Sequence, residues 1–127
     1  MALEALDVYR EERIVEGLPA SVAILERGFQ RLSATLNDSP WRVLGMIAAL
    51  EVCPSAGGAT RARHIGRRAY ELGLFTRPLG ATVYLWPPLN TGQADLLRMV
   101  EILTEAAEEK KDGNNTLPED PFCEKTV

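Results

Sequence analysis

The chain has 127 residues, of which 46% are hydrophobic and 25% charged, and its formal net charge is −4 at pH 7. This length predicts one compact domain with its own core, and the acidic balance makes nucleic acid and acidic membrane surfaces poor candidates as partners. The longest apolar run, residues 43–50, is too short for a membrane-spanning helix, and the residues after Met1 do not resemble a signal peptide, so a cytoplasmic location is expected.

Two helices are predicted in the first third of the chain. The apolar residues of the longer helix are three and four positions apart and so share one face: Leu18, Val22, Leu25, Phe29, Leu32 and Leu36. Residues 2–14 predict a shorter helix before it, and Gly17-Leu18-Pro19 is expected to break or bend the pair. Pro40 ends the helical region after the turn residues Asn37-Asp38-Ser39.

Residues 41–52 (WRVLGMIAALEV) have the length and apolar content of a long buried strand, in which Gly45 marks a bulge or a close backbone approach. A loop over residues 53–60 then leads into another helix. This helix is expected to start at Thr60 and to end at Gly73, which is a C-cap candidate.

Two short strands are predicted next, at Leu74–Arg77 and Thr82–Trp86, and they are expected to pair antiparallel. Pro78 and Gly80 hold the second and fourth positions of the segment RPLG between them, as in a type I turn. The side chains of Tyr84 and Trp86 alternate with those between them and so share one face of the second strand. Together with Trp41 and Tyr70, these aromatic residues are interpreted as packing in the core or at an interface.

The last helix is predicted to have Asn90 as its cap, with Gln93 in the capping-box position. Its buried stripe consists of Leu96, Leu97, Val100, Leu103 and Ala107. Residues 112–127 are polar and aperiodic, which predicts a flexible tail after a domain of residues 1–111. The predicted fold is α/β (α+β), with helices packed on an antiparallel sheet of about three strands.

Few residues of the chain offer catalytic or metal-binding chemistry. His64 stands among the arginines of its helix and fits a solvated helix face better than a catalytic base. Cys53 and Cys123 lack zinc or redox spacing, so neither a metal site nor a structural disulfide is expected. The sequence also shows no Ser/His/Asp set, glycine-rich phosphate loop or paired-carboxylate motif, and it predicts no catalytic residue.

Arg77 stands alone as a charged residue between two apolar runs. Pro78 confines it to extended backbone geometry, which fixes the direction in which its guanidinium leaves the chain. A planar guanidinium can bind a carboxylate through two parallel hydrogen bonds, so a ligand carboxylate is one interpretation. A salt bridge within the fold is the other, and the residues alone favour neither.

The segments WRVLGMIAALEV and YELGLFTRPLGATVYLWPPL, with a helix between them and an amphipathic helix after them, resemble the C-terminal small domain of class III, pyridoxal-phosphate-dependent aminotransferases. Within that family, RPLG followed by YLWPPL is most similar to the biotin-synthesis (8-amino-7-oxononanoate) type. The resemblance implies the small-domain fold of fold-type I aminotransferases. It also implies that Arg77 binds the carboxylate of the amino-acid or keto-acid substrate.

In this family the large domain carries the Schiff-base lysine and the groups that hold the cofactor. Lys110, Lys111 and Lys125 are the only lysines of this chain, whereas imine formation requires a lysine in a dry site. The chain alone is therefore expected to be inactive without a large cofactor-binding domain, and to bind no pyridoxal phosphate. The alternative is a non-catalytic interaction module that self-associates or binds a partner through the exposed former domain interface.

Overall fold

The computed structural model describes residues 2–109, and the tail predicted for residues 112–127 lies outside them. The elements in chain order are α1 (Ala2–Glu11), α2 (Ile14–Thr35), β1 (Trp41–Leu44), β2 (Ile47–Glu51), the 3₁₀ turn η1 (Pro54–Ala56), α3 (Gly58–Glu71), β3 (Thr82–Leu85) and α4 (Gln93–Glu108). The strands form one antiparallel three-stranded sheet in the order β1-β2-β3. The predicted α/β fold with a small antiparallel sheet is therefore confirmed.

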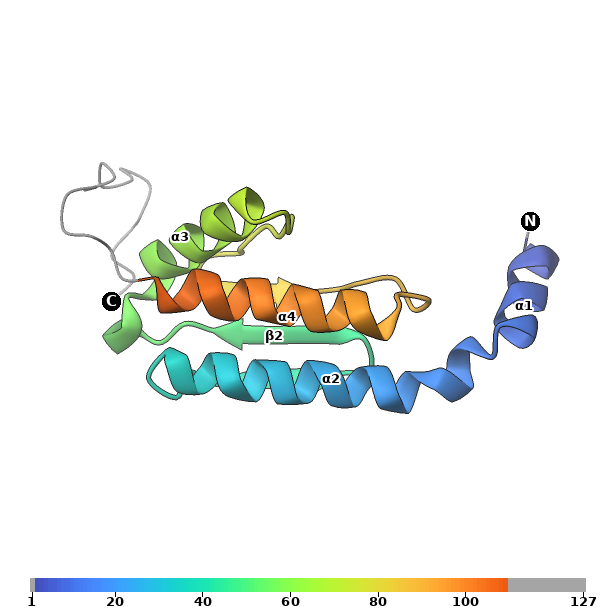
Figure 1. The fold of residues 1–127 in the computed structure, drawn as a ribbon. Coiled ribbons are helices and arrows are strands. Elements are labelled where there is room, and N and C mark those ends of the chain that lie inside the picture. Colours follow the sequence, from blue (N-terminus) through green and yellow to red (C-terminus); the bar gives the residue numbers. More distant parts are fainter. Residues whose placement is uncertain (1, 110–127) are drawn as a thin grey trace.

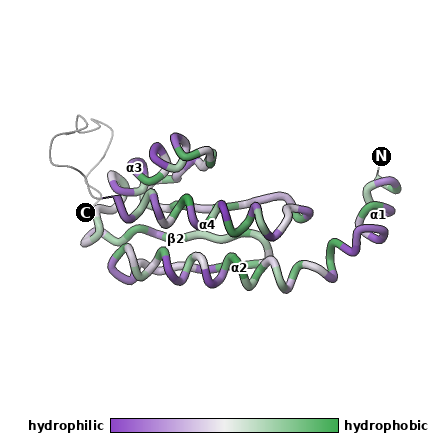
Figure 2. Tube along the Cα trace, viewed as in Figure 1, coloured by the Kyte–Doolittle hydropathy of each residue, from purple (hydrophilic) through white to green (hydrophobic). Residues whose placement is uncertain are grey.

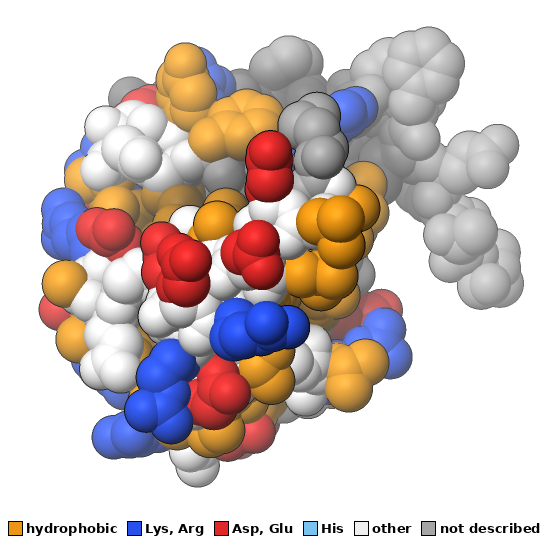
Figure 3. Space-filling view, turned by 90° about the vertical axis from the view of Figure 1, so that its right-hand side faces the viewer, with side chains coloured by type: hydrophobic (Ala, Val, Ile, Leu, Met, Phe, Trp, Pro, Cys, Tyr) orange, Lys and Arg blue, Asp and Glu red, His pale blue; other side chains and the backbone are white. Residues whose placement is uncertain are grey.

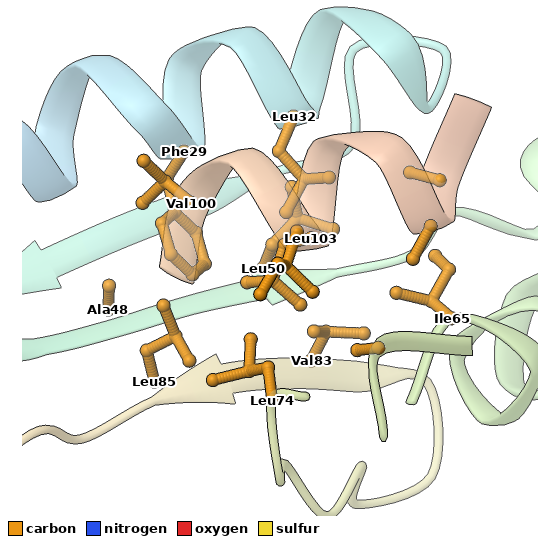
Figure 4. Packing of buried hydrophobic residues seen from close by; sticks show 14 of the residues in the cluster. Phe29, Leu32, Ala48, Leu50, Ile65, Leu74, Val83, Leu85, Val100 and Leu103 are labelled. Atoms are coloured by element: carbon orange, nitrogen blue, oxygen red, sulfur yellow. The ribbon is translucent and has the colours of Figure 1, made fainter. Parts of the chain in front are cut away.

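Helices α2, α3 and α4 cover one side of the sheet (Figure 1). Ala48 and Leu50 of β2, with their partners Leu85 and Val83 of β3, are buried beneath these helices. Figure 4 shows this core, in which side chains of α2 and α4 meet those of the sheet. The opposite side of the sheet carries no helix, so the alternating side chains of the strands leave one sheet face open.

Close packing of α2 against α4 depends on Gly28. A Cβ atom at this position would lie 2.5 Å from Cγ1 of Val100 on α4, so only glycine permits the observed separation of the two helices. Figure 4 shows Val100 beside Phe29, which is fully buried. The two helices thus form the central part of the helical layer.

Helix α1 projects from one end of the molecule (Figure 1), and none of its residues is buried. Hydrophilic and hydrophobic residues alternate along it (Figure 2). Figure 3 views the molecule from this end and shows acidic and basic side chains close together, with hydrophobic ones between them. This end therefore presents charges of both signs.

The two N-terminal helices separate at Glu12 and Arg13, earlier than predicted. Arg13 has a left-handed backbone with φ of 50°, which interrupts the helical hydrogen bonds there. Pro19 instead lies inside α2. A proline so near the start of a helix removes one backbone donor without ending the helix.

The prediction of one long strand over residues 41–52 is wrong, because this segment folds back on itself as the β1-β2 hairpin. Leu44 pairs with Ile47 across a two-residue loop of Gly45 and Met46. Gly45 has φ of 57°, as expected for the glycine-first position of a type II′ turn, and it is neither a bulge nor a close-approach site.

The prediction of a strand at Leu74–Arg77 is also wrong, because residues 74–78 have no regular secondary structure. The strand β3 pairs with β2 instead. The tight turn lies two residues later than predicted, since Leu79 forms an isolated bridge with Thr82. Gly80 has φ of 57° and begins the two-residue loop of this turn.

The start of α4 also differs from the prediction. Its N-cap is Gly92, which makes no side-chain capping bond, so the capping box of Asn90 and Gln93 does not form. Leu97 is exposed, whereas the other four residues of the predicted stripe are buried. At the end of α3, the predicted C-cap is confirmed: Gly73 has φ of 100°, and its N–H and that of Leu74 donate to carbonyls of the last helical turn.

Candidate functional site

Four contacts fix the backbone on both sides of Arg77. Leu74 is buried in the core, and the hydroxyl of Thr76 donates a 2.8 Å hydrogen bond to the carbonyl of Tyr84 on β3. Pro78 packs on Gly66 of α3, and Leu79 pairs with Thr82. These contacts hold the segment in place although it has no regular secondary structure.

The side chain of Arg77, in contrast, extends from this fixed backbone to the surface. Arg77 is exposed, and within residues 2–109 its guanidinium makes no hydrogen bond or ion pair. The salt bridge within the fold, which the sequence left open, is therefore not formed among the described residues. A guanidinium that is exposed and has no partner among the described residues can accept an anionic ligand.

Arg77 lines a shallow surface pocket of about 470 Å³ between α3 and the segment 74–78. The other lining residues are Arg63, Gly66, Arg67, Tyr70, Phe75, Thr76 and Pro78. Tyr70 and Phe75 meet edge to face, with ring centroids 6.3 Å apart. The pocket thus combines three guanidinium groups with an aromatic wall, and no acidic residue lines it.

Sequence reasoning identified Arg77 but not the α3 residues of this pocket. Arg63 and Arg67 are four positions apart and so lie on the same face of α3. That spacing was visible in the sequence. Their position beside Arg77 depends on the packing of Gly66 against Pro78, which no local pattern indicates.

Cys53 lies in a polar environment at the start of η1. Its Sγ is 3.1 Å from the hydroxyl oxygen of Ser55, and the hydroxyls of Ser39 and Ser55 hold the pKa of the thiol below its ordinary value. Within residues 2–109, no group of three His, Cys, Asp or Glu side chains could hold a metal ion. Cys123 lies outside the described residues.

None of the four aromatic residues predicted to pack in the core or at an interface is buried in the core. Trp86 and Tyr70 are 71% and 66% exposed. Trp41, at the start of β1, is also exposed, and Tyr84 is half-buried.

His64 is half-buried on α3 and interacts with neighbouring groups, including the carboxylate of Glu109. None of the described helices is long and apolar enough to cross a bilayer.

Comparison of the sequence with known proteins gives a consistent set of relatives. The adenosylmethionine-8-amino-7-oxononanoate aminotransferase of Nitratidesulfovibrio vulgaris is 34% identical over 110 residues, which are 78% of this chain and 20% of that protein. The omega-aminotransferase of Caulobacter vibrioides is 32% identical over 80% of this chain and 23% of its own length. No protein-family model matches the chain.

Solved structures extend the comparison to the fold. An omega transaminase from Pseudomonas jessenii superposes with a TM-score of 0.73 at 30% identity, over 83% of this chain and 25% of that chain. The adenosylmethionine-8-amino-7-oxononanoate aminotransferase of Methanocaldococcus jannaschii superposes with a TM-score of 0.75 at 19% identity, which supports the fold alone. The chain thus spans about a quarter of the length of the relatives that it matches. It belongs to the class III aminotransferase family.

Proposed function

We propose that this chain is the C-terminal small domain of a class III aminotransferase of the biotin-synthesis (8-amino-7-oxononanoate) type, located in the cytoplasm, and that Arg77 binds the substrate carboxylate. The observation that carries the proposal is the combination of a fixed backbone at Arg77 with an exposed guanidinium that has no partner among the described residues. Because the backbone is already held in place, only the side chain of Arg77 would lose conformational freedom when a carboxylate binds.

Arg77 would act by binding and orienting the substrate. Its guanidinium would donate two parallel hydrogen bonds to one carboxylate, which fixes that end of the substrate. Phe75 and Tyr70 line the same pocket and would lie beside the bound substrate. No proton transfer is assigned to any residue of this chain.

Pyridoxal phosphate would supply the carbanion stabilisation that transamination requires, and a lysine of the protein would hold it. Residues 2–109 contain no lysine, so this part of the chain does not fit covalent attachment of the cofactor. We therefore assign attachment to a large domain that this chain does not contain. The relatives are long enough to hold such a domain, because the chain spans only about a quarter of them.

The second candidate is a non-catalytic interaction module. The open sheet face supports it, because Leu44 is 82% exposed and its cross-strand partner Ile47 is 40% exposed. Exposed apolar side chains gathered on one face are typical of an interface. The same face would also serve as the contact with a large domain, so its exposure alone does not distinguish the two functions, whereas ligand binding by Arg77 does.

The first prediction tests Arg77 in the full 127-residue chain. Titration with butyrate, followed by NMR of the arginine Nε–H signals, is expected to shift the Arg77 signal and the amides of Phe75 and Thr76. Arg77→Gln should abolish these shifts. Arg42→Gln, which changes an exposed arginine of β1 outside the pocket, should preserve them.

Stability provides the control for this experiment. Because the Arg77 guanidinium is exposed, Arg77→Ala should change the free energy of unfolding by only about 0–1 kcal/mol. A loss of several kcal/mol, together with no response to butyrate, would show that Arg77 is a structural residue and would overturn the proposed function.

A further inference from the structure

One side of β3 is an edge of the sheet, because β3 pairs with β2 alone in the order β1-β2-β3. Leu79 covers the first part of this edge, since it and Thr82 exchange two backbone hydrogen bonds of 2.9 Å. The backbone of residues 75–78 makes no hydrogen bond with another backbone group in the part of the chain that the structure describes. The carbonyl of Tyr84, two residues after Thr82 and so on the same edge, accepts instead from the hydroxyl of Thr76.

Thr76 therefore joins this segment to the sheet through its side chain, where a paired strand would use its backbone. The Oγ1 atom lies 2.8 Å from the carbonyl oxygen of β3, and the hydrogen bond is partly buried. On the other side, Pro78 packs on Gly66 of α3, and a Cβ at position 66 would also lie 3.6 Å from the carbonyl oxygen of Thr76. Arg77 thus lies between one attachment to β3 and another to α3.

The direction of the Thr76 side chain also sets that of Arg77. Neighbouring side chains of an extended backbone point to opposite sides, and Pro78 restricts Arg77 to extended geometry. Because the Thr76 hydroxyl is directed at β3, the alternation places Phe75 and Arg77 on the side away from the sheet edge. The burial pattern agrees, since Phe75 and Arg77 are exposed and Thr76 is half-buried between them.

We infer that Thr76 is a positioning residue of the Arg77 site: its hydrogen bond to the Tyr84 carbonyl holds the backbone from which the guanidinium reaches a carboxylate. The inference rests on the proposed function of Arg77, and Thr76 acts through Arg77 and not on the ligand. Without the hydroxyl, the segment loses this attachment to β3, and the backbone conformation that presents Arg77 to the pocket is populated less. The apparent affinity for a ligand falls in proportion to that population.

The second prediction removes this hydrogen bond in the full chain and follows butyrate binding by NMR. Thr76→Val keeps the branched shape of the side chain and its preference for extended backbone, but it lacks the donor. It is expected to weaken butyrate binding about fivefold, which corresponds to one hydrogen bond of ordinary net strength. The Arg77 Nε–H signal should also move before butyrate is added, because the backbone is less restricted. Thr76→Ser keeps the hydroxyl and should retain both the affinity and the signal.

Thr91→Val is the matched control for the loss of a threonine hydroxyl. The Thr91 hydroxyl also donates to a backbone carbonyl, that of Pro88 at 2.7 Å, but neither residue lines the pocket. This variant loses an equivalent hydrogen bond elsewhere in the fold. It should therefore leave both the butyrate affinity and the Arg77 signal unchanged.

The outcomes separate this inference from the proposed function. If Arg77→Gln leaves butyrate affinity unchanged, the proposed function fails, and the inference fails with it. If Arg77→Gln abolishes binding while Thr76→Val binds butyrate as tightly as the unmodified chain, the role of Thr76 is overturned and that of Arg77 stands. Equal weakening by Thr76→Ser and Thr76→Val would show that the hydroxyl is not the cause, which overturns the inference as well.

Discussion

Gly66 determines how the exposed Arg77 is held, although the two residues belong to different segments. A Cβ atom at position 66 would lie 2.6 Å from Cγ and 2.7 Å from Cδ of Pro78. Without a side chain there, the proline ring lies directly on α3, and the proline in turn restricts the backbone of Arg77. A buried glycine of a helix therefore contributes to the position of the side chain that we propose to bind a carboxylate.

The third prediction follows from this contact. Gly66→Ala should lower the free energy of unfolding by about 1–3 kcal/mol, because the new methyl group overlaps the proline ring. Gly17→Ala on α2 is the matched control, since a Cβ at that position would meet no atom within 4 Å apart from the adjacent residues and helix backbone. It should raise the free energy of unfolding by about 0.5–1 kcal/mol through helix propensity alone. Urea denaturation measures both, and equal stabilisation by the two variants would refute close packing at Gly66.

At the scale of elements, helices were easier to predict than strands. The apolar spacing of α2 reports directly on one buried face, and the helix forms there. The β1-β2 hairpin escaped prediction because its turn residue Met46 is apolar and buried, so the segment reads as one continuous apolar run. Gly45 was the only turn signal in it.

The candidate site was predictable to the same limited extent. Arg77 was identifiable because a single charged residue between two apolar runs is unusual in a protein sequence. Arg67 was not, because four arginines of α3 share one local pattern and only tertiary contacts with α4 or with residues 74–78 distinguish them. Local sequence records which residues are unusual, whereas packing decides which of them meet.

The fourth prediction concerns the ion pair between α3 and α4. Arg68 holds the pKa of the Glu109 carboxyl below its ordinary value. A carboxyl group with a lowered pKa in the folded state stabilises the fold above its unfolded pKa, and this contribution is lost as the pH falls through the folded pKa. Glu109→Gln should therefore lower the free energy of unfolding at neutral pH and have no effect at acid pH.

Urea denaturation over a pH series measures this difference between Glu109→Gln and the unmodified chain. Glu101→Gln is the control, because Glu101 lies 3.6 Å from Arg98 in a more exposed pair on α4 alone. Its effect should be smaller, since exposed pairs contribute little. A Glu109→Gln effect that persists unchanged at acid pH would show that the carboxylate charge is not its cause.

One face of the sheet is covered by helices and the other is open, and the two faces differ in how many apolar side chains they expose to solvent. Beneath the helices the strands bury their apolar side chains, as Figure 4 shows. On the open face, Leu44 and Ile47 of the hairpin and Trp86 after β3 remain exposed. Exposed apolar side chains gathered on one sheet face are typical of a surface that contacts another protein segment.

The fifth prediction is that the isolated 127-residue chain self-associates through this open face. A second copy is the partner available to a purified chain, and association removes the exposed apolar side chains from water. Sedimentation velocity should show oligomers whose fraction rises with concentration, and Trp86→Lys should shift the population toward monomer. Leu97→Lys is the control, because Leu97 is an exposed apolar residue of α4 outside the open face, and it should leave association unchanged. A strict monomer at high concentration would contradict the prediction and would also remove the main support for the interaction-module function.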